Sequence, residues 1–505
     1  MGRTVTLTRP SAAKAKTTLA KPKNGHPSKD SKIVPGPMGI VPPRLTLKSL
    51  PQVRTFKSAL DYLNHLPNYE RRSMTARDRG NFTLSRIKRI LTDLDQPHKA
   101  YRSAHIAGTK GKGSTATMLA RMLQANHMKV GLYTSPHIID VRERITINGE
   151  MISEAAFAKT AARVAHVVEK AKADIPTYFE FLTALAFQYF KDQKIDMAVV
   201  ETGLGGRLDA TNVLKPEVCG ITSISYDHMA VLGSTLEDIA TEKSGIMKEH
   251  VPVVSAPQSR NVKMALKKAA EKINAPLIIA GEDIEFSYRF ESSRALGPQA
   301  RICITTPTSH FDHLPVPLVG EHQAVNCGVA IGMLDQLKSR GFRIDDEASV
   351  SGLAKVSLEG RMEMLCTQPR VITDGAHNAS SVEALMRAIG QNIQYDSMVV
   401  IFGCCSDKDV EGMMRLIQLG ADKVIFTNIQ SPRSSTAADL AAKFVEVSGR
   451  MAQTAPTLTD AMVIAEKAIT RDDLICITGS FHLVAEAKQL FADHPHRAAS
   501  KTSPV

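Results

Sequence analysis

The sequence predicts an α/β protein with two mainly parallel sheets, each flanked by helices. From about residue 103 onward, short β-branched runs alternate with longer segments of helical period. A glycine-rich loop lies between one of these runs and the helical segment that follows it. A second alternating series begins after Arg361, so we expect a second sheet.

The predicted elements follow one another in β-α-β order. In the first series we expect strands at 104–107, 129–133, 197–201, 218–224 and 253–255, and helices at 114–126, 154–172, 178–191 and 236–248. In the second series we expect strands at 371–373, 398–402, 423–427 and 474–478, with helical segments between them. A helix-like stretch at 322–337 and a polar stretch at 338–347 separate the two, which places the boundary near residues 345–355. We therefore divide the chain into a basic tail (1–48), a first domain (49–345), a second domain (346–495) and a short disordered tail (496–505).

Composition narrows the classes of protein. The apolar fraction is 43% of 505 residues, and no apolar run approaches the ~20 residues needed to cross a bilayer. Of the net charge of +12, residues 1–48 carry +9, so the rest of the chain is nearly balanced and we expect no nucleic-acid partner. The tail is rich in Lys, Pro, Ser and Thr, which favours disorder through about Pro43. Lysines outnumber arginines there and prolines interrupt it, which argues against a transit peptide.

The seven cysteines are scattered and odd in number, with no CxxC pair. This pattern is typical of a reducing compartment, and we expect a cytoplasmic protein.

The strongest motif is the segment 105–115, which reads His-Ile-Ala-Gly-Thr-Lys-Gly-Lys-Gly-Ser-Thr. A strand that enters a glycine-rich loop and then a helix favours phosphate, because glycines let successive backbone amides converge on an anion. Lys112 adds a point charge for the β- and γ-phosphates, and a following hydroxyl can reach a magnesium ion. The candidate ATP-binding residues of the loop are Gly108, Thr109, Lys110, Gly111, Lys112, Gly113 and Ser114.

The loop departs from the common GxxxxGK[ST] spacing, because Gly113 separates Lys112 from Ser114. With that extra glycine it resembles the phosphate loop of the folylpolyglutamate and dihydrofolate synthase branch of the Mur ligase superfamily. Further segments resemble that family's blocks in the same order, over about residues 50–490. They include Thr134 to His137, Arg142 to Arg144, Thr177 to Glu180, Glu201 to Asn212, Asp227-His228, Glu242 to Ile246, Gly320 to Gln323, Gly360-Arg361 and Asp374 to Asn378.

The resemblance implies the Mur ligase architecture: a P-loop-type, mainly parallel ATPase domain and a smaller Rossmann-like α/β domain. It also implies an ATP-dependent amide ligase that joins L-glutamate to dihydropteroate, to reduced folates, or to both. A carboxylate is a poor acyl donor, so such ligases move the γ-phosphoryl group of ATP onto it and let the amine of glutamate attack the acyl phosphate. The expected partners are these small molecules and ATP, and the protein is expected to be a monomer.

The resemblance also assigns individual residues. It gives Ser135, Glu201 and His228 to Mg²⁺, and it implies that Lys243 is carbamylated, although a Glu-Lys pair on a helix is by itself most often exposed. It gives Thr177, Phe179, Glu180, Gly205, Gly206, Arg207 and Asp209 to the acceptor. It gives Asn326, Arg361 and Asp374 to ATP. Lys112, Lys243 and His377 are the candidate catalytic residues, and a buried, hydrogen-bonded histidine is an equal interpretation of His377.

Two other functions stay open at this point. One is another Mur-type amino-acid ligase, against which the glycine after Lys112 and the block at 177–180 both count. The other is a nucleotide-binding protein without enzymatic activity, whose basic tail binds nucleic acid.

Overall fold

The computed structural model describes residues 50–70, 72, 74–170, 174–293 and 297–493. The tails predicted at 1–48 and 496–505 lie outside these residues. The described residues all belong to one compact unit. Among its helices, none combines the length and the apolar character needed to cross a membrane.

The first sheet has eight strands in the order β4-β3-β2-β5-β1-β6-β7-β8. Their bounds are β1 Arg102–Ala107, β2 Val130–Tyr133, β3 Ile145–Ile147, β4 Glu150–Met151, β5 Met197–Glu201, β6 Val218–Ile221, β7 Val253–Ser255 and β8 Leu277–Ile279. From β2 to β8 every pairing is parallel, which confirms the prediction for this series. The antiparallel strands β3 and β4 at the edge were not predicted, and they depart from the expected β-α-β order.

The helices of this part are α1 Phe56–His65, α2 Ser85–Asp93, α3 Lys112–Ala125, α4 Glu154–Lys170, α5 Tyr178–Asp192, α6 Met229–Leu232, α7 Leu236–Ser244, α8 Arg260–Lys272, α9 Glu321–Ser339 and α10 Asp346–Ala354. Helices α3 and α9 bury apolar residues against one face of the sheet, and α7 and α8 against the other. The alternation of β1 follows from this: Ala104 and Ile106 face α3 and α9, whereas His105 and Ala107 face the opposite side.

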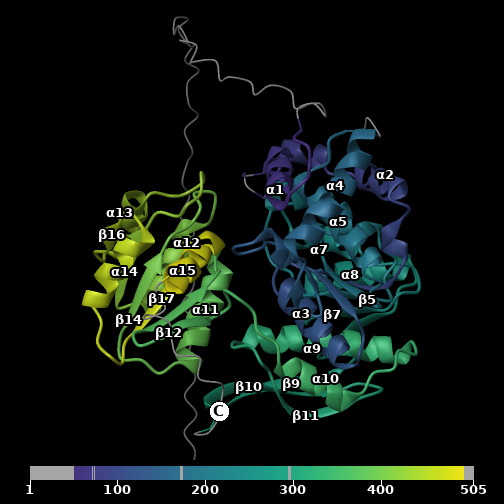
Figure 1. Ribbon diagram of the computed structural model, residues 1–505. Coiled ribbons are helices and arrows are strands. Elements are labelled where there is room, and N and C mark those ends of the chain that lie inside the picture. Colours follow the sequence, from purple (N-terminus) through teal and green to yellow (C-terminus); the bar gives the residue numbers. More distant parts are fainter. Residues whose placement is uncertain (1–49, 71, 73, 171–173, 294–296, 494–505) are drawn as a thin grey trace, which may run out of the picture. The chain divides into compact units, whose positions relative to one another are not determined.

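A small antiparallel sheet of β9 Glu285–Ser293, β10 Gly297–Thr305 and β11 His310–Pro315 packs on α9 (Figure 1). Ile302 and Ile304 join the core that α9 shares with the first sheet. Phe286 approaches α9 so closely that a Cβ on Gly328 would lie 2.7 Å from its ring. This sheet was not expected from the sequence, although the spacing of Ile302 and Ile304 is the period-2 signal of a half-buried strand.

The second large sheet has the order β12-β13-β17-β14-β15-β16. Its strands are β12 Glu363–Thr367, β13 Arg370–Asp374, β14 Met398–Phe402, β15 Lys423–Thr427, β16 Gln453–Ala455 and β17 Leu474–Thr478, and its helices are α11 Ala379–Asn392, α12 Val410–Gly420, α13 Ala437–Ser448, α14 Leu458–Lys467 and α15 Phe481–Asp493. Helices α11 to α13 bury one face, and α14 and α15 the other. The four predicted strands are confirmed, and only the edge strand β12 is antiparallel.

Helix α10 packs on α3, because a Cβ on Gly352 would lie only 2.4 Å from the carbonyl oxygen of Arg121. Residues 346–354 therefore belong to the helical layer of the first sheet.

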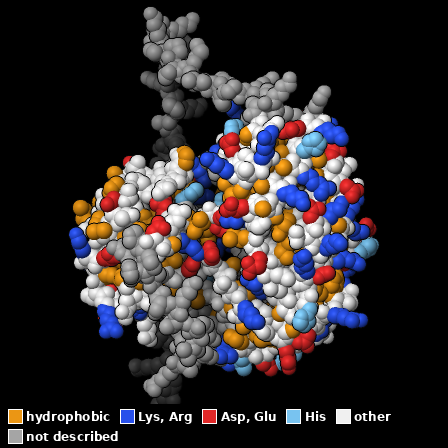
Figure 2. Space-filling view, in the orientation of Figure 1, with side chains coloured by type: hydrophobic (Ala, Val, Ile, Leu, Met, Phe, Trp, Pro, Cys, Tyr) orange, Lys and Arg blue, Asp and Glu red, His pale blue; other side chains and the backbone are white. Residues whose placement is uncertain are grey.

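Lys and Arg side chains are interspersed with Asp and Glu over the visible face of the described residues, with no continuous basic stripe on that face (Figure 2).

Candidate active site

The carboxyl ends of β1, β2, β5 and β6 meet at one edge of the first sheet, where ligands of parallel α/β sheets bind. At the end of β1 the backbone turns sharply into α3. Gly108 has φ +154° and Gly111 has φ +83°. A Cβ on Gly108 would lie 1.8 Å from Thr222 Oγ1, and one on Gly111 2.0 Å from Asn326 Oδ1. Only glycine fits both positions, and α3 begins without a side-chain cap, which leaves its first amides available to an anion.

The two residues between these glycines are anchored through their backbone. The amides of Thr109 and Lys110 donate to the carbonyl of Ser223, at 3.0 and 3.3 Å. The ammonium group of Lys110 is buried and has no hydrogen-bond partner among the described residues. Burial lowers the pKa of Lys110 to about 8. A buried cation without a partner favours an anionic ligand nearby.

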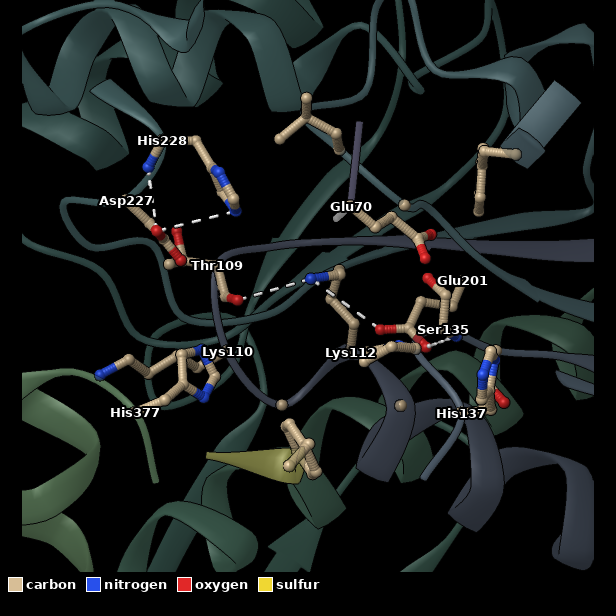
Figure 3. A pocket seen from close by; sticks show the side chains of 18 of the residues that line it. Glu70, Thr109, Lys110, Lys112, Ser135, His137, Glu201, Asp227, His228 and His377 are labelled. Atoms are coloured by element: carbon tan, nitrogen blue, oxygen red, sulfur yellow. Dashed lines mark hydrogen bonds and ion pairs between the residues drawn. The ribbon is translucent and has the colours of Figure 1, made fainter. Parts of the chain in front are cut away.

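Lys112 opens α3 and lies next to Glu201, the last residue of β5. Its Nζ is 3.9 Å from Glu201 Oε1 and donates to the carbonyl of Thr109 at 3.4 Å. The amide of Ser135 donates to Glu201 Oε2 at 3.0 Å (Figure 3). Burial raises the pKa of Glu201, and the neighbouring Lys112 opposes that rise. The sheet thus places a buried carboxylate, a hydroxyl residue and a cation at the mouth of the phosphate loop.

Of the three predicted metal ligands, the structure brings Ser135 and Glu201 together. His228 lies instead beside Asp227, at 3.7 Å, on the other side of Lys112 in Figure 3. The described residues hold no group of three or more His, Cys, Asp or Glu that could bind a metal ion. The Ser135 hydroxyl and Glu201 Oε1 are hard oxygen donors, which suits a divalent ion whose other ligands are water or phosphate oxygens.

Lys243, on α7, points inward and is only 4% exposed. Its Nζ donates to the carbonyl of Gly108 at 2.7 Å. Burial, with a further contribution from the charge of Lys112, lowers the pKa of Lys243 to about 7. Its neighbour Glu242 pairs with Arg207 at 2.8 Å, so the two adjacent residues do not form an exposed pair. A lysine that is partly neutral near pH 7 has the nucleophilicity that carbamylation requires.

The predicted acceptor loop, 203–209, is bound to α7. The amide of Arg207 donates to the carbonyl of Glu242 at 2.8 Å. A Cβ on Gly206 would lie 2.6 Å from the carbonyl oxygen of Lys243, so this close approach of two backbones requires glycine. Asn212 donates to the carbonyls of Arg207 and Gly245. The loop and the helix that carries Lys243 therefore form one packed unit.

The predicted acceptor residues at the start of α5 have visible local roles. Thr177 and Glu180 form a capping box: Thr177 Oγ1 accepts from the amide of Glu180, and Glu180 Oε2 accepts from the amide of Thr177. Arg86 also donates to Glu180, at 3.0 Å. Phe179 packs over Gly203, whose Cβ would lie 2.6 Å from the ring. Phe179 thus places its aromatic ring beside the acceptor loop.

Asn326 and Arg361 were both predicted to contact ATP. Asn326 lies in α9, donates to Gln323 Oε1 at 3.0 Å and places its amide oxygen against Gly111. The Cζ atom of the Arg361 guanidinium lies 5.0 Å from the centre of the Phe481 ring, which is a cation–π distance.

Asp374 and His377 lie at the end of β13. Asp374 is buried and accepts from the amides of Met362 and Ala376, while burial raises its pKa. The Nδ1 of His377 is 2.8 Å from the carbonyl of Gly375, and burial lowers its pKa to about 4. The neutral ring must donate its Nδ1 proton to this carbonyl, which leaves Nε2 as a hydrogen-bond acceptor.

No role was expected from the sequence for an ion pair between the buried Arg144 and the exposed Glu70. Arg144 is 1% exposed and makes two hydrogen bonds to the carboxylate of Glu70, at 2.9 and 2.6 Å. Its Nε also donates to His137 Nδ1 at 2.8 Å. Arg144 lies in a segment that the family resemblance had marked, but Glu70 is 74 positions away and only the fold reveals the pair.

A cavity of ≈ 2110 Å³ unites these groups. It is larger than the about 300–1,000 Å³ of a site for one small ligand, so it has room for two. Every predicted site residue lines it except Gly108 and Lys243, which are joined by their hydrogen bond.

The chain matches two protein families by sequence. Residues 106–334 match the family described as Mur ligase middle domain. Residues 360–481 match the family described as Mur ligase, glutamate ligase domain.

Relatives and solved structures extend these matches. The chain is 34% identical over 411 residues to the dihydrofolate synthase/folylpolyglutamate synthase of Bacillus subtilis, covering 80% of this chain and 94% of that protein. E. coli FolC in complex with DHPP and ADP superimposes with a TM-score of 0.76 at 27% identity, covering 88% of this chain and all of that one. A bifunctional folylpolyglutamate synthase/dihydrofolate synthase with Mn, AMPPNP and L-glutamate bound superimposes with a TM-score of 0.74 at 30% identity, covering 88% and 99%.

Proposed function

This chain belongs to the folylpolyglutamate synthase and dihydrofolate synthase family of Mur ligases and is an ATP-dependent ligase that adds L-glutamate to folates, and we propose that it acts on both dihydropteroate and reduced folates. The observation that carries the proposal is the cavity in which the phosphate loop, the Glu201 carboxylate and the acceptor loop, 203–209, meet. The two activities in the name of the Bacillus subtilis relative support a bifunctional enzyme.

The reaction proceeds in two steps. A carboxylate oxygen of the acceptor attacks the γ-phosphorus of ATP, which forms an acyl phosphate and releases ADP. The amine of L-glutamate then attacks the acyl carbon, the amide bond forms, phosphate leaves and the amine loses a proton. Negative charge must be neutralised in both steps.

The phosphate loop and Lys112 hold the β- and γ-phosphates. The positive end of the α3 helix dipole and the Lys112 ammonium both stabilise the negative charge that moves from the acceptor to ADP. Asn326, Arg361 and Asp374 hold the rest of the nucleotide, with Arg361 as a rigid two-pronged donor to phosphate.

Ser135 and Glu201 would hold a divalent ion, which we propose is Mg²⁺; when bound, the ion neutralises phosphate charge and orients its oxygens. The donor set fits, because both side chains offer oxygen. His228 would join only through Asp227 or a water molecule, since it does not lie in a cluster with Glu201. Mn in a related structure supports the use of a divalent ion.

The acceptor lies against Phe179 and the loop 203–209, with its ring system on the aromatic face and its carboxylate toward the phosphate loop. His377 offers an acceptor Nε2 that can take the proton of the glutamate amine. Thr177 and Glu180 act by fixing the start of α5, and Arg207 by holding the loop to α7. Carbamylation of Lys243 would turn a buried cation into an anion next to the phosphate loop.

We also propose that the nucleotide-binding part ends and the glutamate-ligase part begins between α10 and β12, and that the protein works as a cytoplasmic monomer. All seven cysteines are unpaired, which supports a reducing compartment.

The test is phosphate release by the purified protein with ATP, Mg²⁺ and L-glutamate, in parallel with dihydropteroate, with tetrahydrofolate and without acceptor. Release with both acceptors is expected, and release with one alone would restrict the enzyme to that activity. Absence of stimulation by either would refute the folate assignment and favour another Mur-type acceptor. Lys112→Met is the control, because it should remove release under every condition.

A further inference from the structure

Three buried polar side chains form a hydrogen-bonded series that connects strand β1 to the acceptor loop, 203–209. His105 and Thr211 are fully buried, and Asp209 is 5% exposed. His105 Nε2 lies 2.8 Å from Thr211 Oγ1. The Thr211 hydroxyl in turn donates to Asp209 Oδ1.

The fold explains why these residues meet. The alternation of β1 turns His105 away from α3 and α9, toward the face of the sheet where α7 and α8 pack. A 3-10 turn, Ala210–Val213, follows the acceptor loop and brings Thr211 to that face. Burying two polar groups there is favourable only because they satisfy each other.

The number of protons on each group decides which residue donates in each of these hydrogen bonds. A hydroxyl has one proton, and Thr211 gives it to Asp209, so Thr211 Oγ1 must accept from His105 Nε2–H. The other ring nitrogen, Nδ1, is buried and has no hydrogen-bond partner among the described residues. Burial lowers the pKa of His105 to about 3, so the ring is neutral and carries a single proton, on Nε2.

The chain ends on the residue that closes the loop. Asp209 Oδ2 accepts from the amide of Leu204 at 2.8 Å, and Oδ1 accepts from the amide of Thr211 at 3.0 Å. One carboxylate therefore joins both ends of the loop, and residues 203–210 line the cavity. The carboxylate can keep this geometry only while its donors hold it.

We propose that His105 and Thr211 are positioning residues for the acceptor: they hold the Asp209 carboxylate, and with it the loop 203–209, in the shape that receives the folate or its precursor. The inference rests on the proposed function, because it names residues that act on the same site. Strand β1 pairs with β5 on one side and β6 on the other. Loss of the hydrogen bonds of His105 and Thr211 therefore releases the acceptor loop but leaves the phosphate loop in place. Acceptor binding is affected, and nucleotide binding is not.

Two matched pairs of variants test this. In His105→Gln the amide nitrogen can take the place of Nε2 and keep the donor, whereas in His105→Asn the polar group reaches only the place of the unpartnered Nδ1. Thr211→Ser keeps the hydroxyl and Thr211→Val removes it at nearly the same shape. For His105→Asn and Thr211→Val the KM for the acceptor should rise about tenfold, the effect of one lost buried hydrogen bond, while the Kd for ATP stays within about twofold.

The conservative variants should restore most of the acceptor affinity. Equal KM values in all four variants and the wild type would overturn the proposal. So would a rise in the Kd for ATP as large as the rise in KM, because that is the result of general loosening of the fold.

A second readout separates this inference from the proposed function. Amide hydrogen exchange at Leu204 and Thr211 should quicken in His105→Asn and Thr211→Val relative to their partners, while exchange in β5 and β6 stays unchanged. If the wild type fails to ligate any folate but this exchange pattern appears, the function is wrong and the positioning chain stands. If the wild type ligates and the exchange is unchanged, the positioning chain is wrong.

Discussion

Lys243 and Gly108 are 135 positions apart in the chain, yet the ammonium of the lysine donates to the carbonyl of the glycine at 2.7 Å. This bond joins the helix that holds the acceptor loop to the first residue of the phosphate loop. It also removes Lys243 from water, and burial lowers its pKa from 10.5 to about 7. Both the stability and the chemistry of the protein should show this.

The stability of the protein should depend on pH through Lys243. Below about pH 7 the lysine is protonated in both states, and the cost of burying its charge is constant. Between about 7 and 10.5 the unfolded state binds a proton that the folded state does not, so stability rises with pH. We expect Lys243→Met to gain stability relative to wild type near pH 7, and this advantage should narrow toward pH 10.5 in CO₂-free urea titrations. If the free energy of unfolding changed with pH in the same way in the wild type and in Lys243→Met, the lowered pKa of Lys243 would be contradicted.

Lys243 should also react with carbon dioxide. The neutral amine attacks the carbon of CO₂, a proton leaves, and a carbamate forms. Incubation with ¹³C-labelled bicarbonate should give a carbamate carbon resonance in the wild-type protein. Lys243→Arg keeps a cation but cannot form the carbamate, so it should lack the resonance and lose turnover. The same signal in both proteins would place the modification elsewhere.

Lys112 should govern nucleotide binding through its charge. Lys112→Met keeps most of the side-chain volume and removes the cation that faces Glu201 and the phosphate loop. We expect kcat to fall about 10²- to 10³-fold, as when one group that stabilises transition-state charge is removed. Calorimetry with a non-hydrolysable ATP analogue should show weaker binding. Lys263→Met is the matched control, because Lys263, on α8, pairs with Glu282 outside the cavity, so its loss should leave both quantities unchanged.

The contact between the acceptor loop and α7 should tolerate no added methyl group. In Gly206→Ala the Cβ meets the carbonyl oxygens of Lys243 and Glu242 at 2.6 and 2.8 Å, and neither backbone can move freely. We expect a loss of about 1–3 kcal/mol in the free energy of unfolding and a higher KM for the acceptor. Gly390→Ala is the control, because nothing lies within 4 Å of a Cβ at that position. Its free energy of unfolding should rise slightly, because alanine favours a helix more than glycine does. Similar behaviour of the two variants would refute the close contact.

The parallel strands were predictable because they are buried on both faces and read as short apolar runs. Met197–Glu201 and Met398–Phe402 were expected at their observed bounds. The exposed antiparallel sheet on α9 was missed, because its strands carry apolar residues only at alternate positions and include polar residues such as Arg301. Its sequence signal is weaker than that of a buried strand, although it was present.

The site divides in the same way. The phosphate loop could be predicted because one local segment contains all its chemistry. The inward orientation of Lys243 could not, since adjacent residues on a helix point in different directions and the sequence does not say which of Glu242 and Lys243 faces the core. The contact between His105 on strand β1 and Thr211 in the 3-10 turn joins residues that are 106 positions apart, and no local pattern encodes it.

The basic tail offers the sharpest contrast between an enzyme and a nucleic-acid-binding protein. Residues 1–48 hold +9 of the net charge of +12, and the visible face of the described residues shows no basic stripe. A chain from which residues 2–45 are deleted keeps the whole compact unit that begins at residue 46, so we expect kcat and KM to stay within about twofold of the full chain. Any binding of the full chain to DNA should weaken steeply with salt, because it arises from released counterions, and should disappear on truncation. A large fall in turnover on truncation would show that the tail takes part in catalysis. Salt-sensitive DNA binding that survives truncation would locate a nucleic-acid site on the folded part and revive the alternative function.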